Sequence, residues 1–416
     1  MFKEIKYDFD VIVVGGGASG MMAAGISASQ GKKVLLLEKN RELAEKVKMT
    51  GGGRCNITNA EYDNRILLKN YGMAEQFLYS PFSQFGVKDT FTFFEKLGLP
   101  LVVQARKRAF PQTEKAIDVV MVLEKYMRDG GVNIKTNSTV SKVLKEMDKI
   151  TGIKVGSKIY TASSYILATG GISRTKDGFS GDGFSWLRDL GHKVKAPTPT
   201  VVPLAVKDIW IKSMPGVSLS FMKITFYLDG VKKFFKTGKI LFTHFGLSGP
   251  LILNSSTKVA ELLRAGIVTA KIDAYPDTNE AELEKKIIKV FDENKNKLFK
   301  NVLDEIVPHG TVDAIISLLK NIDPSTKIHS ITRENRKQIV ILLKALPVSI
   351  TGLMGFDRAV IADGGVDLAE IDMKTMRSKL YKNLYITGDL LHINRPSGGF
   401  SLQLCWTTGY IAGKNA

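Results

Sequence analysis

A glycine-rich string directly after a short apolar run constrains this chain more than any other feature. Residues 9–14 (FDVIVV) are apolar and β-branched, as in a buried strand, and lead into GGGASG at 15–20. A small-residue stretch of helical character follows and ends near Gly31, and a second β run at 33–37 ends at Glu38. The order strand, glycine-rich turn, helix, strand predicts a βαβ unit of the Rossmann type, and hence an α/β fold.

The spacing of these residues predicts a dinucleotide site. Gly15 permits the tight turn, Gly17 lets a pyrophosphate approach the backbone, and Gly20 lets the helix pack closely on the strand. The helix start at Ala18 and Ser19 would face the phosphates. Glu38 lies eighteen residues beyond Gly20, where a carboxylate can accept hydrogen bonds from ribose hydroxyls. An acidic residue there disfavours a 2′-phosphate, which leaves FAD or NAD.

The C-terminal end of the chain distinguishes these two. A strand is expected at 384–387, followed by Gly388-Asp389 and then by Ser397-Gly398-Gly399 before a last helix at about 402–411. Asp389 is placed to bind ribityl hydroxyls, and the free N–H groups of a helix start near Gly399 can stabilise negative charge on a reduced isoalloxazine. NAD needs neither feature and FAD uses both, so we expect non-covalently bound FAD.

Two internal glycine-rich segments point to the same site. GGGRCN at 51–56 is too rich in glycine for the interior of an element and suggests backbone running against a ligand, with a flexible hinge as the alternative. ATGG at 168–171 follows an expected strand at 165–167. From the residues alone, the cofactor-contacting candidates in these two segments are Gly52, Gly53, Arg54, Cys55, Thr169 and Gly170.

The remaining composition narrows the chemistry. There is no second dinucleotide motif and no CxxC, and the five His show no metal-ligand spacing, so we expect no metal. Two cysteines, Cys55 and Cys405, indicate a reducing compartment, by default the cytoplasm. The most apolar stretch, 11–28, contains five glycines and is better explained by a strand and helix than by a membrane span.

The net charge of +18 would suit a polyanionic partner. The lysines are scattered through amphipathic stretches with few interleaved aromatics, so solvated helix faces account for them at least as well. A nucleic-acid partner is therefore not the expectation from charge alone.

Changes in pattern along the chain predict three parts. Residues 1–190 and 347–416 form a discontinuous Rossmann-like FAD-binding domain. A β-rich lobe is expected at 191–278, where a hairpin turns at Asp229-Gly230, and a small helical lobe at 279–346, where apolar residues recur at three- and four-residue spacing.

Six ordered motifs resemble a family of bacterial flavoproteins that includes aminoacetone oxidase and 3-dehydro-bile-acid reductase, related more distantly to fumarate-reductase-type flavoproteins. The motifs are VIVVGGGASGMMAA, KVKMTGGGRCNITN, RAFPQTEKAIDVV, ILFTHFGLSGP, DGGVDLAEIDMKTMRSK and ITGDLLHINRPSGGFSLQLCWTTGYIAG. The resemblance implies a Rossmann-like domain interrupted by a β-barrel-like lobe and a helical lobe. It also implies FAD contacts from the residues Gly15 to Gly20, Glu38, Lys39, Gly53 to Cys55, Val140, Asp389, Gly399, Phe400 and Ser401.

The chain departs from the family pattern beside Asp389. His392 and Arg395 add cationic potential near the expected flavin edge, where the family is usually acidic or neutral, so the substrates of the named members need not carry over.

These features predict an FAD-dependent oxidoreductase that acts on a small organic substrate by hydride transfer at flavin N5. Arg108 and His244 are the candidates for orienting substrate or transferring a proton. An oxidase and a reductase of an activated double bond both remain open, the latter with NAD(P)H as a transient donor. A flavin-containing RNA-binding or tRNA-modifying protein is the alternative, and the oligomeric state is open.

Overall fold

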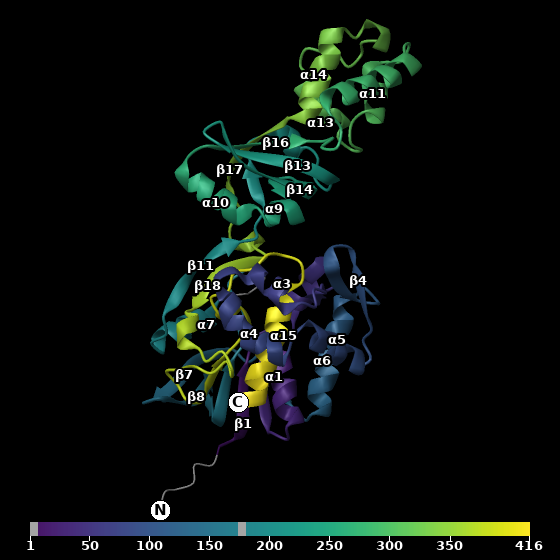
Figure 1. Ribbon diagram of the computed structural model, residues 1–416. Coiled ribbons are helices and arrows are strands. Elements are labelled where there is room, and N and C mark those ends of the chain that lie inside the picture. The colour runs from purple at the N-terminus through teal and green to yellow at the C-terminus, as the bar shows by residue number, and fades with distance from the viewer. Residues whose placement is uncertain (1–6, 174–179) are drawn as a thin grey trace, which may run out of the picture. The chain divides into compact units, whose positions relative to one another are not determined.

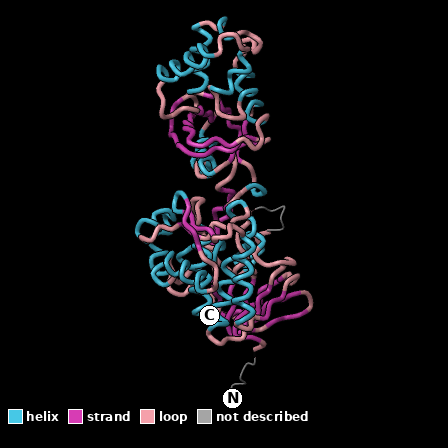
Figure 2. The backbone as a smooth tube through the Cα atoms, turned by 90° about the vertical axis from the view of Figure 1, so that its right-hand side faces the viewer, coloured by secondary structure: helices cyan, strands magenta, loops and turns pink. Residues whose placement is uncertain are grey.

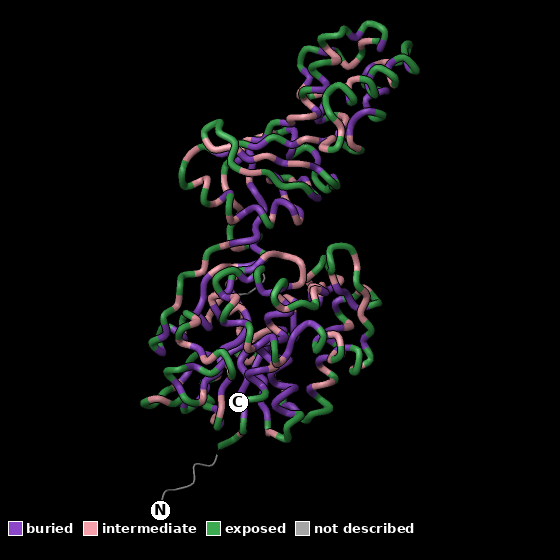
Figure 3. The backbone as a smooth tube through the Cα atoms, in the orientation of Figure 1, coloured by how far each residue is buried: buried purple, intermediate pink, exposed green. Residues whose placement is uncertain are grey.

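The computed structural model describes residues 7–173 and 180–416, and the chain divides into two compact units (Figure 1). Unit 1 comprises Met1–Thr198 and Ala362–Ala416, and unit 2 comprises Pro199–Ile361. Each unit has its own hydrophobic core. In Figure 3 the buried stretches of unit 1 gather along its central sheet and the helices beside it. The mixed α/β class and the interrupted first unit agree with the sequence prediction.

A parallel sheet of five strands forms the centre of unit 1. Its order is β19-β10-β1-β2-β6, with every neighbouring pair parallel. The strands are β1 (Phe9–Val14), β2 (Val34–Leu37), β6 (Asn133–Lys135), β10 (Ala162–Leu167) and β19 (Leu384–Ile386). The middle strands are nearly continuous apolar runs because helices cover both faces of such a sheet. All five carboxyl ends lie at one edge.

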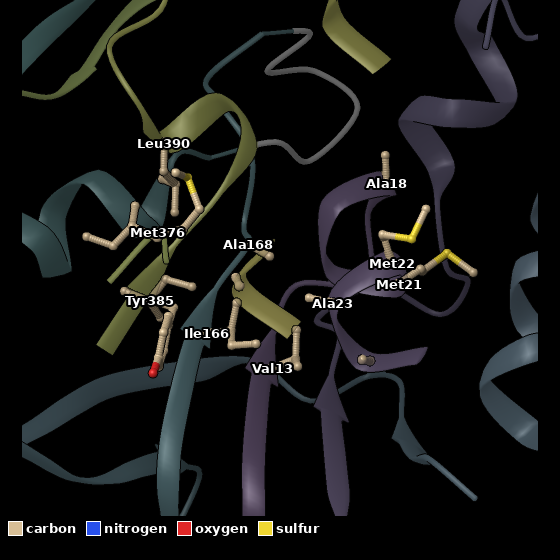
Figure 4. Close-up of a cluster of buried hydrophobic side chains, with 14 of the residues drawn as sticks. Val13, Ala18, Met21, Met22, Ala23, Ile166, Ala168, Met376, Tyr385 and Leu390 are labelled. Atoms are coloured by element: carbon tan, nitrogen blue, oxygen red, sulfur yellow. The ribbon is translucent and has the colours of Figure 1, made fainter. Parts of the chain in front are cut away.

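Helices α1 (Ala18–Ser29) and α15 (Phe400–Asn415) pack closely against each other beside this sheet. A Cβ added at Gly409 would collide with the carbonyl oxygen of Ser19, and one at Gly413 would collide with that of Ala23. The Ser27 hydroxyl donates to the Gly413 carbonyl oxygen at 2.9 Å. Figure 4 shows how α1 residues and sheet residues share one core, with labelled side chains that include Val13, Ala18, Met21, Met22, Ala23, Ile166 and Ala168.

The other elements of unit 1 surround this centre. The helices are α2 (Glu45–Met49), α3 (Asn64–Leu68), α4 (Glu75–Gln84), α5 (Val87–Lys96), α6 (Ala116–Asp129) and α7 (Asp182–Asp189), with 3-10 turns η1 (Thr50–Gly52), η2 (Lys69–Ala74), η3 (Ala105–Lys107), η8 (Leu368–Glu370) and η9 (Gly388–Leu390). A small sheet β3-β5-β4 comprises Thr58–Asn59, Arg108–Pro111 and Leu101–Gln104, and another, β7-β8-β9, comprises Val140–Glu146, Lys149–Val155 and Lys158–Tyr160. Strands β11 (Val194–Thr200) and β18 (Ile361–Val366) pair where the chain passes from one unit to the other.

Unit 2 contains a closed six-stranded barrel, visible as a ring of strands in Figure 2. Its order is β12-β15-β14-β13-β16-β17, formed by Leu204–Val206, Gly246–Ser248, Val231–Thr243, Ser218–Leu228, Val268–Asp273 and Leu346–Leu353. Helices α8 (Ile209–Lys212), α9 (Pro250–Leu253), α10 (Ser256–Ala265), α11 (Glu280–Glu293), α12 (Phe299–Val302), α13 (Val312–Leu318) and α14 (Arg333–Lys344) accompany it, with 3-10 turns η5 (Leu303–Glu305), η6 (Ile328–Ser330) and η7 (Phe356–Arg358).

Three sequence predictions at the level of single elements can be compared with the structure. Asp229 and Gly230 have φ of 49° and 80°, as a tight hairpin turn requires, so the predicted hairpin is confirmed. The return to unit 1 comes later than residue 347, because β17 pairs with both β12 and β16 and closes the barrel. The sequence is strand-like from 135 to 143, which predicts one strand there, but the structure has two, β6 and β7, because Asn137 between them takes a left-handed conformation.

No helix among residues 7–173 and 180–416 is both long enough and apolar enough to cross a membrane.

A buried histidine ties together three segments of unit 1. His192, 4% exposed, has Nδ1 2.8 Å from Glu370 Oε2 and Nε2 3.0 Å from the hydroxyl oxygen of Ser378. Burial disfavours the imidazolium more than Glu370 favours it, so the pKa of His192 is lowered from its ordinary value of 6.5.

The packing of α15 on α1 generates a stability prediction. Replacing a helical glycine by alanine ordinarily stabilises by about 1 kcal/mol. At Gly409 the added methyl group collides with backbone, so Gly409→Ala should lower the free energy of unfolding by roughly 1–3 kcal/mol. Denaturant titration measures this. Gly352→Ala is the control, because a Cβ there meets nothing within 4 Å; equal effects of both substitutions would contradict the packing argument.

The His192 network generates a pH prediction. The pKa of His192 is lower in the folded protein than its ordinary value of 6.5, so at pH values between the two the unfolded chain binds more protons than the folded protein. The contribution of His192 to stability is therefore complete above pH 6.5 and is lost as the pH falls through the folded pKa. The free energy of unfolding should therefore decrease from about pH 7.5 to about pH 5.5, and less steeply in His192→Asn. Identical pH slopes in parent and variant would show that His192 does not carry the effect.

Candidate functional site

The carboxyl edge of the central sheet brings together four of the predicted segments. Gly15 follows β1, Glu38 follows β2, Thr169 and Gly170 lie just beyond β10, and Asp389 lies just beyond β19. Ligands of open parallel sheets bind outside this edge. The structure thus assembles at one place residues that are up to 374 positions apart in the sequence.

The three fingerprint glycines differ in what surrounds them. Gly15 has φ of 107°, and an added Cβ would lie 2.5 Å from the Ala168 carbonyl oxygen, so this position requires glycine. At Gly20 a Cβ would collide with the Gly15 carbonyl oxygen. At Gly17 a Cβ would meet nothing within 4 Å, so open space lies where a pyrophosphate is expected. No side chain caps the start of α1, whose first N–H groups remain available to an anion.

Glu38 is buried and holds the turn in shape. Its Oε2 accepts from the Gly16 N–H at 2.7 Å and its Oε1 from the Asn40 N–H at 2.8 Å. Each carboxylate oxygen has a second lone pair, so ribose hydroxyls can still be bound. Lys39 turns away from Glu38 and donates to the Ser180 hydroxyl at 2.6 Å, with Asp182 at 3.3 Å.

A pocket lies beside Glu38 at the strand ends. Its lining includes the ends of β1 and β2, Val140 at the start of β7, and Thr169. The Thr169 hydroxyl is buried without a hydrogen-bond partner among the described residues, which is costly unless a ligand satisfies it. The open space at Gly17, the uncapped helix start and this hydroxyl fit the adenosine and pyrophosphate of a dinucleotide.

The start of α15 is pressed against β3. Gly399 has φ of 100°, and a Cβ there would collide with the backbone of Thr58. The Asn59 side-chain amide donates to the Gly398 carbonyl oxygen at 3.2 Å, and the Thr58 hydroxyl donates to Gln403 Oε1 at 2.6 Å. No side chain caps α15, so its first N–H groups can stabilise negative charge on a flavin. Phe400 is buried and Ser401 is partly exposed at this helix start.

Arg395 folds back onto the cofactor-binding segment. The residue is 3% exposed. Its guanidinium pairs with the Asp389 carboxylate, donates to the Ile393 carbonyl oxygen at 2.7 Å and donates to the Ser401 hydroxyl at 3.1 Å. The side chain thus links Asp389, expected at the ribityl chain, to the start of α15. It holds a positive charge between the two features that distinguish FAD from NAD.

His392 lies in a separate contact. Its Nε2 is 3.3 Å from Asp363 Oδ1 and 3.1 Å from the Lys195 ammonium, so it joins β11 to β18. This position links two strands and gives no direct evidence for a role at the flavin.

The segment 51–55 has an unusual backbone. Gly51, Gly52, Gly53 and Cys55 all have φ between 58° and 85°. A Cβ at Gly52 or Gly53 would meet nothing within 4 Å, and both residues are exposed. This run therefore presents accessible backbone. Burial raises the pKa of the Cys55 thiol to about 12, which makes it inert and not a nucleophile.

Arg108 lies one strand from the start of α15. It is opposite Asn59 in the β3–β5 pairing, and Asn59 contacts Gly398. Burial, Arg106 and Arg54 all lower the pKa of Arg108. Arg54 stacks on Phe110 at 4.5 Å and has Glu114 at 3.5 Å. Among residues 7–173 and 180–416 no hydrogen bond or ion pair involves the Arg108 side chain.

His244, the other predicted candidate, lies in unit 2. It is exposed in the turn between β14 and β15 and contacts the ring of Phe245 edge-on at 4.9 Å. The residues in its own motif thus leave the imidazole open to solvent.

The sequence did not identify some residues of the pocket. Ser180, Asp182 and Trp186, around the start of α7, line it, and two of them hold Lys39. Lys46 donates to the Gly171 carbonyl oxygen at 2.7 Å and fixes the turn after β10. The contacts of Lys39 with Ser180 and Asp182 span 141 and 143 positions, and no motif in the sequence indicated them.

The contrast between Gly17 and Gly20 generates a binding prediction. Gly17→Val should fold with an unchanged melting temperature in the absence of FAD, because the side chain enters open space, yet it should retain little FAD. Gly20→Ala should instead fail to fold, since its methyl group collides with backbone. Absorbance at the flavin band and thermal melting of the apoprotein measure the two properties. Full FAD occupancy in Gly17→Val would contradict the assigned position of the pyrophosphate.

The chain is similar to curated proteins over nearly its whole length. A 3-dehydro-bile acid delta(4,6)-reductase from Clostridium scindens is 29% identical over 409 residues, covering 97% of this chain and 98% of that protein. Ribosomal RNA dihydrouridine synthases from Haemophilus influenzae and Escherichia coli are 26% and 25% identical over 404 and 411 residues, covering 96% and 98% of both chains.

Among solved structures, a 3-ketosteroid-delta4-(5alpha)-dehydrogenase from Rhodococcus jostii matches with a TM-score of 0.56 at 13% identity, covering 100% of this chain and 98% of that one. This likeness establishes the fold. The family described as HI0933-like protein Rossmann domain matches residues 9–415. The resemblance seen in the sequence is thereby confirmed, and the chain belongs to the HI0933-like family of FAD-binding, Rossmann-type oxidoreductases.

Proposed function

We propose that this protein is an FAD-dependent reductase that saturates a carbon–carbon double bond conjugated to a carbonyl group. One observation carries the proposal: two differently named kinds of full-length relative share this chemistry. A 3-dehydro-bile acid delta(4,6)-reductase reduces double bonds in conjugation with a 3-oxo group, and a dihydrouridine synthase saturates the uracil double bond beside a carbonyl. The identities are similar, 29% and 26%, so the reaction class is the feature common to both.

Saturation of such a bond adds a hydride equivalent to one carbon and a proton to the other. FAD, once reduced by a two-electron donor, supplies the hydride equivalent at N5. The protein must then hold the carbonyl, stabilise the negative charge that develops on its oxygen, and deliver the proton.

Arg108 has the properties needed to hold the carbonyl. It is half-buried, lies opposite Asn59 and therefore near the start of α15, and has no carboxylate partner among the described residues. Burial, and after it Arg106 and Arg54, lower its pKa, which strengthens the guanidinium as a hydrogen-bond donor. We assign Arg108 to bind the substrate oxygen and stabilise its charge.

His244 is the proposed proton donor. Its exposed imidazole can exchange protons with solvent, and its ring is held only by contact with Phe245 among the described residues. Protonation of the carbon beside the carbonyl needs a positioned donor, and an imidazole N–H can serve as one.

The electron donor in this proposal is NAD(P)H. The sequence contains one dinucleotide motif, which FAD would occupy, so NAD(P)H would bind transiently and without a dinucleotide motif of its own. A small organic enone is the proposed substrate. The rRNA-modifying relatives make a uracil base the second candidate, because they match this chain over its whole length.

Anaerobic rapid mixing tests the proposal. The flavin should bleach with NADH or NADPH, and the reduced protein should then be reoxidised under argon by a cyclic enone or by uridine in RNA, but not by the saturated ketone. Reoxidation by oxygen alone, with no response to either conjugated compound, would identify an oxidase and overturn the proposal.

The role of Arg108 has its own test. Arg108→Ala should slow enone-dependent reoxidation by roughly 10²- to 10³-fold, because a donor to the developing charge is lost. FAD content and reduction by dithionite should stay unchanged. Arg128→Ala removes an exposed guanidinium on α6 of the same unit that does not act on the pKa of Arg108, and it is the control. Equal rates in the two variants would remove Arg108 from the mechanism.

A further inference from the structure

Three barrel strands of unit 2 present one continuous outward face. On β13, Lys223, Thr225 and Tyr227 alternate with buried Met222, Ile224 and Phe226. Strand pairing places Thr225 opposite Phe235 of β14 and Lys271 of β16. The next level pairs Tyr227 with Lys232 across a β-bulge. We call Lys223, Tyr227, Lys232, Phe235 and Lys271 the barrel face; Figure 1 labels its three strands, and Figure 3 marks most of β14 as exposed.

Cations surround both aromatic rings of this face. The Lys223 and Lys232 ammonium groups lie 4.9 and 5.6 Å from the centre of the Phe235 ring, and Lys271 lies 5.5 Å from that of Tyr227. Phe235 is nevertheless 52% exposed. Exposure of an aromatic ring to water is unfavourable, and a flat ring flanked by ammonium groups is a surface on which a base can stack. Proteins that bind unpaired bases combine these two kinds of side chain.

Phe221 is a further exposed aromatic residue on β13. It lies at a bulge two residues before Lys223, is 70% exposed and has φ of 60°. A bulky, exposed aromatic residue in this left-handed conformation is uncommon.

Two carboxylates on the strands and turn of this face are already engaged by other groups. Asp273, paired with Lys223 in the β-ladder, lies 2.8 Å from the Lys344 ammonium, and Asp229 accepts from the Ile267 N–H at 3.0 Å in the hairpin turn. The hairpin from 218 to 243 contains five lysines and one acidic residue. The charge of the barrel face is therefore available to an anion.

We propose that the barrel face binds an unpaired RNA strand, with bases stacked on Phe235 and Tyr227 and phosphates on Lys223, Lys232 and Lys271. Stacked rings flanked by lysines recognise single strands, whereas paired bases leave no ring to stack. A second copy of this chain fits less well, because its own face would bring the same positive charge. The inference concerns binding and goes beyond the reaction proposed above, since it holds whichever compound the flavin reduces.

Fluorescence anisotropy with labelled oligouridylate of about twelve nucleotides tests the proposal on the oxidised holoprotein. The triple variant Lys223→Glu, Lys232→Glu, Lys271→Glu should weaken binding by at least about tenfold and reduce the slope of log affinity against log salt by about 2. Phe235→Leu, which keeps the charge and removes the ring, should weaken binding by roughly 5- to 100-fold.

The matched control is Lys285→Glu, Lys289→Glu, Lys300→Glu, which makes the same change in net charge on exposed helical positions of the same unit. It should bind RNA much more tightly than the barrel-face triple variant. Equal losses in both triple variants, or no binding by the parent at about 0.15 M salt, would overturn the proposal.

Binding to other nucleic acids and self-association are measured beside these variants. An RNA duplex should bind the parent more weakly than the single strand, and single-stranded DNA should bind less tightly than RNA; tighter binding of the duplex would contradict stacking on Phe235 and Tyr227. A change in mass by light scattering for Phe235→Leu would make the face an interface between copies and overturn the proposal. Flavin reduction by NAD(P)H should be the same in all variants, so failure of the binding result is distinct from failure of the proposed reaction.

Discussion

The site depends on the close approach of α1 and α15, which only small residues allow. Gly409 and Gly413 bring the α15 backbone against the carbonyl groups of Ser19 and Ala23, and the Ser27 hydroxyl closes the contact with a hydrogen bond. This contact joins the two ends of the chain beside one sheet. The N–H groups at the start of α1 and of α15 then lie on the cofactor side of the same core. FAD requires this, because its pyrophosphate and its isoalloxazine are separated by the ribityl chain and need two separate binding segments.

The sequence predicted those parts of the site that obey local rules. The glycine positions at 15, 17 and 20 follow from the geometry of a strand-to-helix turn, and the structure gives each of them the surroundings that the rule requires. Gly399 was predicted from a helix start, and its contact with Thr58 supplies a second reason for glycine.

Contacts between distant segments were not predictable in the same way. The pairing of Lys39 with Asp182 depends on where α7 returns, and the burial of Arg395 against Asp389 depends on a side-chain rotation. The sequence drew attention to Arg395 but could not predict that its side chain would pair with Asp389.

The end of the barrel was missed for a similar reason, since β17 is recognisable as a strand but its partners are not. The grouping of the lysines could not be predicted from the sequence either. Strand pairing places Phe235, Thr225 and Lys271 side by side, although they are up to 46 positions apart. Aromatic and cationic side chains that are separated in the sequence thus become neighbours on the barrel.

Hydrogen exchange on the apoprotein with and without FAD tests the two-part site most directly. The account predicts that FAD protects amides at 15–20 and also at 52–55 and 398–404, whereas ADP protects the first group alone, because ADP lacks the ribityl chain and isoalloxazine. Protection by FAD confined to the N-terminal segment, with exchange at the start of α15 unchanged, would contradict the account.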